Sequence, residues 1–244
     1  MDDPKHTDDP RHTADPQHTD GARNPDGPGD RPSVVLFDLG NVLFRDPWEA
    51  LLLTEGAGLA DRIGLDRGEV EAAGRRLWRR FSVVEADEQA YWDALGRELG
   101  RAVPPSLVKE LEEHLLLANP AAGELLAAAA DGGSRPVGIA SNNTSFWYAK
   151  QAERLSLHRW VDPRLVFLSH ELGVTKGARG RGLLEAAAER THPPSTLLIE
   201  DRAGNLRRAR GLGFRTAAYA FEGAAASEGF KTTDSRELLR RLSV

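Results

Sequence analysis

Five short apolar runs, each followed by polar or small residues, set the main constraint on how this chain can fold. Stretches with apolar residues at helical spacing separate them. This alternation predicts an α/β protein with a Rossmann-like parallel sheet of about five strands flanked by crossover helices. The expected strands are 34–38, 137–141, 165–169, 197–201 and 214–221.

A long stretch without a strand signal separates the first two runs. Amphipathic patterns such as Leu107, Leu111 and Leu115 indicate about four or five helices there, broken by turn signals such as Pro104-Pro105. An insertion after the first strand lies over the carboxyl edge of that strand, where it forms a cap. We therefore expect an α/β core formed by residues 32–45 and 132–244, and a helical cap formed by residues 46–131.

Residues 1–31 carry almost no apolar side chains and contain an imperfect repeat of the form Asp-Pro-x-His-Thr. Such a segment cannot bury enough surface to offset its ordering entropy, so we predict a disordered low-complexity leader. The three evenly spaced histidines are suited to weak binding of a transition metal, but a solvated leader is the preferred interpretation. No catalytic role is assigned to it.

The composition excludes several classes of protein. The 244 residues include no cysteine, which rules out disulfides, thiolate zinc sites and cysteine nucleophiles. A net charge of -5 and a pI near 5.8 give no general attraction for nucleic acid or anionic lipid. No apolar run approaches the ~20 residues of a membrane span, and the N-terminus lacks the apolar centre of a signal peptide. We expect a cytoplasmic protein with neither nucleic-acid nor membrane partners; the sequence predicts no oligomeric state.

The first expected strand ends on Asp38, within the sequence FDLGNVL, and Gly40 and Asn41 then allow a tight turn. Open α/β sheets bind ligands at the carboxyl ends of their strands. Asp38 is therefore a candidate nucleophile or metal ligand. The simpler alternative is that its side chain only caps a turn.

The second expected strand ends on Ser141, which is followed by Asn142 and Asn143 and by a helix that starts near Ser145. A hydroxyl and unpaired backbone amides at a strand-to-helix junction can bind a phosphate group. Ordinary capping of the helix is the alternative interpretation.

Two further motifs follow the third and fourth expected strands. Lys176, after a glycine turn, could neutralise charge on a nucleophilic carboxylate and a phosphoryl group, or lie solvated at the surface. Glu200 and Asp201 are adjacent acids that repel each other unless a cation lies nearby, so we interpret them as part of a magnesium site. The alternative interpretation is that they are ordinary acidic residues at a helix N-terminus. Because these motifs all meet at one sheet edge, together they indicate a site.

In their order and spacing, the motifs FDLGNVL, SNN, LSHELGVTK and EDRAGN resemble those of the haloacid dehalogenase-like (HAD) hydrolase superfamily over residues 34–219. They look most like the small sugar-phosphate phosphatases whose first motif also reads DLGNV. The resemblance implies that Asp38 is the nucleophile, Ser141 the phosphate-binding hydroxyl and Lys176 the charge-stabilising lysine.

The same resemblance implies that Asp201 is the acidic metal ligand. Asn142 would help to bind phosphate, while Glu200 and Asn205 would support the metal site. Magnesium would be held by Asp38, the carbonyl of Gly40 and Asp201, and would screen the repulsion between carboxylate and phosphate.

The reaction implied by the resemblance is the magnesium-dependent hydrolysis of a small phosphorylated metabolite, such as a sugar phosphate. Asp38 would attack phosphorus in line and form an aspartyl-phosphate that water then cleaves. The cap inserted after the first motif would hold most of the selectivity for the substrate.

Gly40 departs from the usual pattern, because most family phosphatases and mutases carry a second aspartate there. That aspartate protonates the leaving oxygen, and a general acid supplies roughly 10²- to 10⁴-fold in rate. Three explanations stay open: a substrate with a good leaving group, another acid such as Asp46, His170 or a cap side chain, or poor activity. The similar DLGNV phosphatases have the same glycine, which disfavours the third. A phosphomutase needs this acid, so that activity is disfavoured.

A second departure follows Lys176, where family members usually place proline and continue into a helix. Residues 177–182 are instead rich in glycine and arginine. Either Arg179 and Arg181 meet a second anionic group on the substrate, or the segment is a flexible basic loop, which we slightly favour.

Two other functions remain as alternatives. A dehalogenase is compatible with Gly40, because cleavage of a carbon–halogen bond needs no leaving-group proton, but the Glu200-Asp201 pair has no obvious use in that chemistry. A non-catalytic binding protein on the same fold is the other, and the presence of Asp38, Ser141 and Lys176 counts against it.

Overall fold

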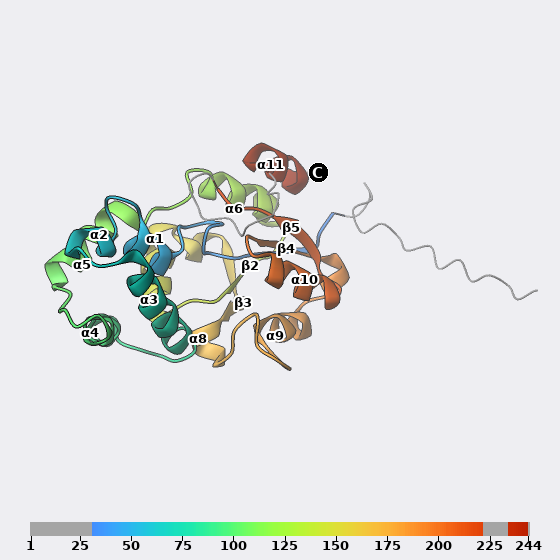
Figure 1. The fold of residues 1–244 in the computed structure, drawn as a ribbon. Coiled ribbons are helices and arrows are strands. Elements are labelled where there is room, and N and C mark those ends of the chain that lie inside the picture. Colours follow the sequence, from blue (N-terminus) through green and yellow to red (C-terminus); the bar gives the residue numbers. More distant parts are fainter. Residues whose placement is uncertain (1–30, 222–233, 244) are drawn as a thin grey trace, which may run out of the picture.

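The structure is a computed structural model that describes residues 31–221 and 234–243. The predicted leader lies outside these residues except for Arg31, whose guanidinium pairs with Asp131 at 2.8 Å. A parallel sheet with helices on both faces confirms the predicted Rossmann-like α/β class (Figure 1). Its five strands lie in the order β3-β2-β1-β4-β5, and they are β1 (Val34–Phe37), β2 (Val137–Ser141), β3 (Val161–Leu168), β4 (Thr196–Glu200) and β5 (Arg215–Ala218).

Strand β1 is the central strand, and its side chains alternate between two apolar layers. Val35 pairs in register with Val137 on one side and Leu197 on the other. Val35 and Phe37 belong to one buried cluster, whereas Leu36 belongs to a second. A strand buried on both faces reads as a continuous apolar run, which is why the sequence located it correctly.

Helices cover both faces of the sheet (Figure 1). Helices α6 (Ala122–Ala130) and α11 (Ser235–Ser243) contribute to the cluster that contains Val35. Helices α9 (Leu183–Arg190) and α10 (Ala203–Gly211) contribute to the cluster that contains Leu36. The result is a three-layer core with the carboxyl ends of the strands left open at one edge.

A separate group of helices follows β1. They pack around an apolar cluster of their own. The predicted cap, residues 46–131, also included α6, but α6 packs on the sheet with α11, so the change from one cluster to the other falls between α5 and α6. The helices of the separate group are α1 (Pro47–Leu53), α2 (Leu59–Ile63), α3 (Arg67–Phe81), α4 (Glu88–Glu98) and α5 (Pro105–Leu115).

Helix α7 (Ser145–Arg154), which follows β2, joins the two clusters. Its Trp147 is fully buried among the aromatic rings of the α1–α5 group and donates from Nε1 to Glu112 (3.2 Å). One turn further, the ammonium of Lys150 lies 2.7 Å from Glu88 and 2.6 Å from Glu112. The helix that begins at the predicted phosphate loop is thus held by side chains from α4 and α5.

Two strands differ in extent from the sequence-based prediction. β3 begins at Val161 rather than at residue 165. The sequence did not predict its first residues because they include Pro163 and Arg164, which are exposed and interrupt the apolar pattern of the strand. Proline is tolerated there since β3 is an edge strand, and the register with β2 shifts between Val137 and Ile139. β5 ends at Ala218, before the predicted residue 221. The short helix α8 (Ser169–Leu172) follows β3 directly.

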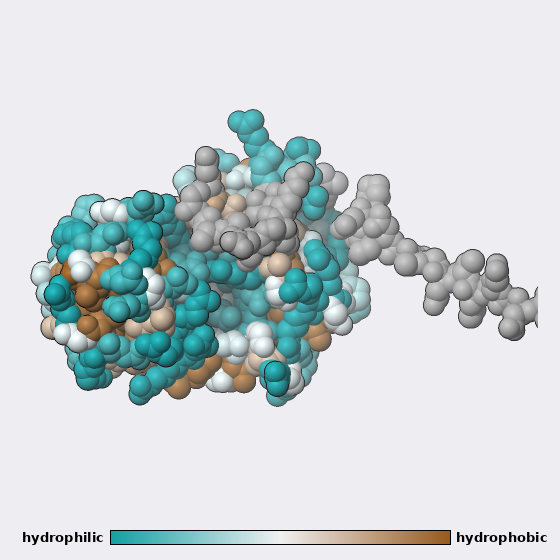
Figure 2. All heavy atoms as spheres, viewed as in Figure 1, coloured by the Kyte–Doolittle hydropathy of each residue, from teal (hydrophilic) through white to brown (hydrophobic). Residues whose placement is uncertain are grey.

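Hydrophilic residues cover most of the face seen in Figure 2, and hydrophobic residues reach that surface near α5. Among the described residues, no helix has the length and apolarity needed to cross a membrane.

Gly138 is required where β2 meets β3. A Cβ at this position would lie 2.6 Å from Cδ2 of Leu36 and would also run into the carbonyl oxygen of Leu165. Only a residue without a side chain lets the two strands approach while Leu36 packs beneath them.

Gly138→Ala should therefore lower the free energy of unfolding by about 1–3 kcal/mol, the usual cost of overpacking a core. Urea-induced unfolding of the variant and of the unaltered protein measures this difference in the free energy of unfolding. Gly123→Ala in α6 is the matched control, because nothing lies within 4 Å of the added methyl there. Equal stability of the two variants would contradict the close approach described above.

Candidate active site

The carboxyl ends of β1, β2 and β4 bring the predicted site residues together at one edge of the sheet. Asp38 follows β1, Ser141 ends β2, and Glu200 ends β4 just before Asp201. The backbone N–H of Asp38 donates to the carbonyl of Ile199 (2.9 Å), which continues the ladder between β1 and β4 up to this edge. The parallel register thus sets Asp38 beside the acidic pair.

Asn41 stabilises the sharp turn that follows β1. Its φ of 58° lies in the left-handed region, which asparagine tolerates better than most residues. Its side-chain amide donates to Asp201 (3.1 Å), and its side-chain oxygen accepts from the backbone N–H of Asp46 (3.1 Å). Asn41 therefore ties the Asp38 loop to β4 and to the start of α1, a role that its place in a turn motif did not reveal.

Lys176 is fully buried between two carboxylates. Its ammonium lies 2.9 Å from Oδ2 of Asp38 and 2.6 Å from Oε2 of Glu200. Burial alone would lower the pKa of Lys176, but Asp38 and Glu200 outweigh burial and raise it. The backbone N–H of Lys176 donates to the side chain of Asn142 (2.8 Å), which holds the lysine loop against the loop after β2. The solvated alternative for Lys176 is excluded by this burial.

Asp38, Glu200 and Asp201 form a buried acidic cluster whose oxygens lie within 4.8 Å of one another. Burial, followed by the charges of Glu200 and Asp38, raises the pKa of Asp201 to about 9. Burial and Glu200 raise the pKa of Asp38 to about 6 against the opposing effect of Lys176. A further cation would relieve this repulsion.

The donor atoms of this cluster fit a hard divalent cation such as magnesium. Both oxygens of Glu200 are already used, Oε2 by Lys176 and Oε1 by the backbone N–H of Arg202 (2.9 Å). Burial would raise the pKa of Glu200, but Lys176 outweighs burial and lowers it. Asp38 also has both oxygens in contact, Oδ1 with the N–H of Leu39 (2.7 Å) and Oδ2 with Lys176, and Oδ2 of Asp201 contacts Asn41 and Arg202. The prediction that Asp38 and Asp201 hold the ion therefore rests on the acidic cluster as a whole.

Ser141 lies at the end of β2 with its hydroxyl fully enclosed. Among the described residues, its Oγ has no hydrogen-bond partner that meets ordinary geometry, although the nearby hydroxyl slightly lowers the pKa of Asp38. A buried hydroxyl left unpaired costs about 1–3 kcal/mol, which is tolerated where a ligand completes the bond. The phosphate-binding role that its motif suggested for Ser141 stays a prediction, with which this unpaired hydroxyl agrees.

No protein-family model matches the chain, and no curated protein matches its sequence significantly. Solved structures do match. A predicted HAD-like family hydrolase from Porphyromonas gingivalis is 17% identical, with a TM-score of 0.53, over 79% of this chain and 92% of its own. The fold is that of the HAD-like hydrolases.

Two other solved structures with the HAD-like fold differ in what they bind. A HAD family enzyme from Bacteroides thetaiotaomicron, in complex with magnesium and inorganic phosphate, is 16% identical with a TM-score of 0.54, over 83% of this chain and all of its own. The L-2-haloacid dehalogenase from Xanthobacter autotrophicus, with chloropropionic acid covalently bound, is 20% identical with a TM-score of 0.52, over 77% of each chain. At these identities the likeness establishes the fold alone.

His170, one of the residues considered as a replacement acid, is buried beside the loop after β2. Its Nδ1 lies 3.0 Å from the carbonyl oxygen of Asn143. A carbonyl can only accept, so Nδ1 carries the proton and holds the loop in place. Ser169 acts similarly, because its hydroxyl accepts from the Asn143 N–H (2.9 Å) and donates to the carbonyl of Ser82 (2.5 Å).

Asn205 and the arginines of the loop after Lys176 make no hydrogen bond to the acidic cluster among the described residues. Asn205 lies in α10, and within residues 31–221 and 234–243 no hydrogen bond joins its side chain to the acids. Arg181 donates to Glu189 on α9 (2.9 Å), and Arg179 is exposed. The supporting role of Asn205 therefore stays a prediction, and the loop agrees with its interpretation as a basic surface segment.

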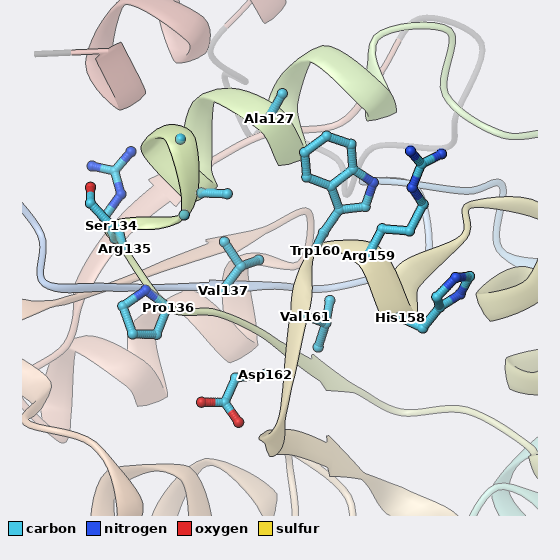
Figure 3. A pocket seen from close by; sticks show the side chains of 13 residues that line it. Ala127, Ser134, Arg135, Pro136, Val137, His158, Arg159, Trp160, Val161 and Asp162 are labelled. Carbon is cyan, nitrogen blue, oxygen red and sulfur yellow. The ribbon is translucent and has the colours of Figure 1, made fainter.

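Cavities occur on both sides of this HAD-like fold. One of about 440 Å³ adjoins the site and is lined by residues that include Asn41, Asp46 and Glu49. A larger one of about 640 Å³ lies at the opposite edge of the sheet, where β2 and β3 begin. Figure 3 shows the indole of Trp160 reaching toward Ala127 above that cavity. It is remote from Asp38 and has no part in the site.

Without magnesium, the free energy of unfolding should fall as pH rises from about 5 to about 9. The pKa of Asp201 is raised to about 9, and burial and Glu49 raise that of Asp46 to about 8. Both groups titrate near 4 when unfolded, so the folded protein binds more protons across this window. Magnesium bound by Asp201 would displace the proton of that carboxyl, so the effect of magnesium on Tm should grow with pH.

Thermal unfolding in EDTA and in magnesium, measured across that window, checks this expectation. Asp201→Asn should flatten the pH dependence in EDTA and remove most of the gain from magnesium. A magnesium effect on Tm that is the same at every pH would contradict the assignment of raised carboxyl pKa values to the ion site.

Proposed function

We propose that the protein is a magnesium-dependent phosphatase that hydrolyses a small phosphorylated metabolite through an aspartyl-phosphate on Asp38. The observation that carries this proposal is the buried cluster in which Lys176 contacts Asp38 and Asp201 lies close by. A nucleophilic carboxylate shielded from water, beside a fixed cation and a second acid, suits attack on an anionic phosphoryl group.

The residues of the cluster divide the chemistry among them. With a pKa of about 6, Asp38 is ionised at neutral pH and supplies the oxygen that bonds to phosphorus. Ser141 and Asn142 bind the phosphoryl oxygens, and Lys176 offsets their charge. Magnesium, held by Asp38, Asp201 and the carbonyl of Gly40, would neutralise charge on the transferring group.

The comparison structures support this proposal to different degrees. The Bacteroides thetaiotaomicron enzyme binds magnesium and inorganic phosphate, the two ligands that the cluster of this chain suits. A sugar phosphate is the proposed substrate, from the DLGNV motif at 38–42. A panel of sugar 1-phosphates, sugar 6-phosphates and nucleotides would measure the preference.

A dehalogenase is the second candidate, because the Xanthobacter autotrophicus enzyme has the same fold. Gly40 agrees with that chemistry, which needs no leaving-group proton. Asp201, however, would place an unneeded buried carboxyl beside the nucleophile, where burial and the charges of Glu200 and Asp38 raise its pKa. A bound cation would relieve that repulsion, which gives Asp201 a use in the phosphatase. The phosphatase is therefore preferred.

Hydrolysis of p-nitrophenyl phosphate should require magnesium, and Asp38→Asn should lower it by at least about 10³-fold because the nucleophile is lost. The rate of nitrophenolate release measures this. Asp162→Asn is the control, since Asp162 lies at the opposite edge of the sheet and bonds to Arg164. It should retain the rate of the unaltered protein.

The same preparations, supplied with 2-chloropropionate, should release no halide. Halide release that Asp38→Asn abolishes, without phosphatase activity, would establish the dehalogenase instead. Failure to turn over any member of either substrate panel, despite magnesium binding, would favour the non-catalytic alternative.

A further inference from the structure

The space beside Gly40, where most related phosphatases carry their acid, is filled from another position of the chain. A Cβ built on Gly40 would lie 3.3 Å from Oδ2 of Asp46 and 3.7 Å from its Cγ. The carboxyl of Asp46 therefore lies where the side chain of residue 40 would project. A residue six positions later has brought the same functional group to the same place.

The backbone of Asp46 is held firmly there. It precedes the first residue of α1, its carbonyl accepts from Ala50 (2.9 Å), and its N–H donates to the side chain of Asn41 (3.1 Å). Because Asn41 also binds Asp201, the carboxyl of Asp46 is positioned from the same loop that positions the predicted metal ligands.

The two oxygens of Asp46 have different surroundings. Oδ2 faces the guanidinium of Arg202 at 3.6 Å, and Glu49 holds that guanidinium from the other side at 2.8 Å. Oδ1 is buried and, among the described residues, has no hydrogen-bond partner. The carboxyl that crowds Gly40 through Oδ2 therefore keeps one enclosed oxygen without a hydrogen-bond partner in the described part of the chain, as expected of a group whose bond a ligand completes.

The other candidates fit this role less well. His170 uses Nδ1 to hold the carbonyl of Asn143. Glu49 resembles Asp46 in facing Arg202 with one oxygen and in having the other buried and, within the residues that the structure describes, unpaired, but the three atoms nearest to a Cβ built on Gly40 all belong to Asp46. The hydroxyl of Tyr91 is unpaired, but its ring lies inside the aromatic cluster of the cap against Trp147.

We propose that Asp46 is the general acid and base of this enzyme and takes the place of the side chain absent at Gly40; this rests on the proposed phosphatase function. As Asp38 bonds to phosphorus, the bond from phosphorus to the leaving oxygen breaks and the carboxyl proton of Asp46 passes to that oxygen. The resulting carboxylate then takes a proton from the water that cleaves the aspartyl-phosphate, which releases phosphate and restores both residues.

Aryl phosphates of similar shape but different leaving groups test this proposal. With phenyl phosphate, whose leaving group is a strong base, Asp46→Asn should lower kcat/KM by about 10²- to 10⁴-fold. With p-nitrophenyl phosphate, which leaves without help, the loss should stay below about 10-fold. Glu49→Gln is the matched control, because Glu49 pairs with the same arginine, Arg202. This variant should change kcat/KM for the two aryl phosphates by the same factor.

Moving the carboxyl back provides the reciprocal test. Gly40→Asp combined with Asp46→Gly removes the crowding at residue 40 and should recover part of the phenyl phosphate activity that Asp46→Asn loses. Thermal unfolding of each variant verifies that it is folded.

Equal losses on the two aryl phosphates in Asp46→Asn, or no loss on either, would overturn the assignment while leaving the phosphatase intact. Turnover of p-nitrophenyl phosphate alone by the unaltered protein would also overturn it, since no acid would then be acting. Turnover of neither substrate with magnesium would refute the proposed function itself.

Discussion

The buried ammonium of Lys176 is the interaction on which the site depends. Three carboxyls meet at one edge of the sheet, and a buried charge is tolerated only when it is paired. Lys176 bonds to Asp38 and Glu200, and Arg202 pairs with Asp201 at 3.1 Å, so one lysine and one arginine offset the charge of the cluster that could hold a metal ion. Because the lysine comes from the loop after α8 while Asp38 follows β1 and Glu200 ends β4, the same contact holds separate parts of the chain in one arrangement.

Helix α7 links this site to the cap. It begins just after the loop that carries Ser141, and its Trp147 and Lys150 are bound by the aromatic rings and acids of the cap helices. Because the phosphate loop and this anchored helix are continuous, the position of the cap and the geometry of the phosphate site are mechanically connected. If the protein is the proposed phosphatase, the helices expected to select the substrate and the loop expected to bind the phosphoryl group share this support.

The sequence predicted the sheet well and the packing of the helices less well. Strands β1, β2 and β4 are continuous apolar runs buried on both faces, so their pattern is unambiguous. The first half of β3, an edge strand with Pro163, has no such pattern. Helix α6 is rich in alanine and leucine, which suit either the cap or the sheet, and only the available apolar surfaces place it on the sheet.

The sequence by itself determined the α/β class, the order of the strands along the chain and the four motifs, because these follow from short-range apolar patterns and from the chemistry of individual side chains. It could indicate Asp38, Ser141, Lys176 and Asp201 as a group. Only the tertiary structure decided that Glu200 accepts a hydrogen bond from Lys176 and that the carboxyl of Asp46 lies next to Gly40. Such placements depend on how distant segments pack and on which charges must be paired when they are buried, and neither is written in local spacing.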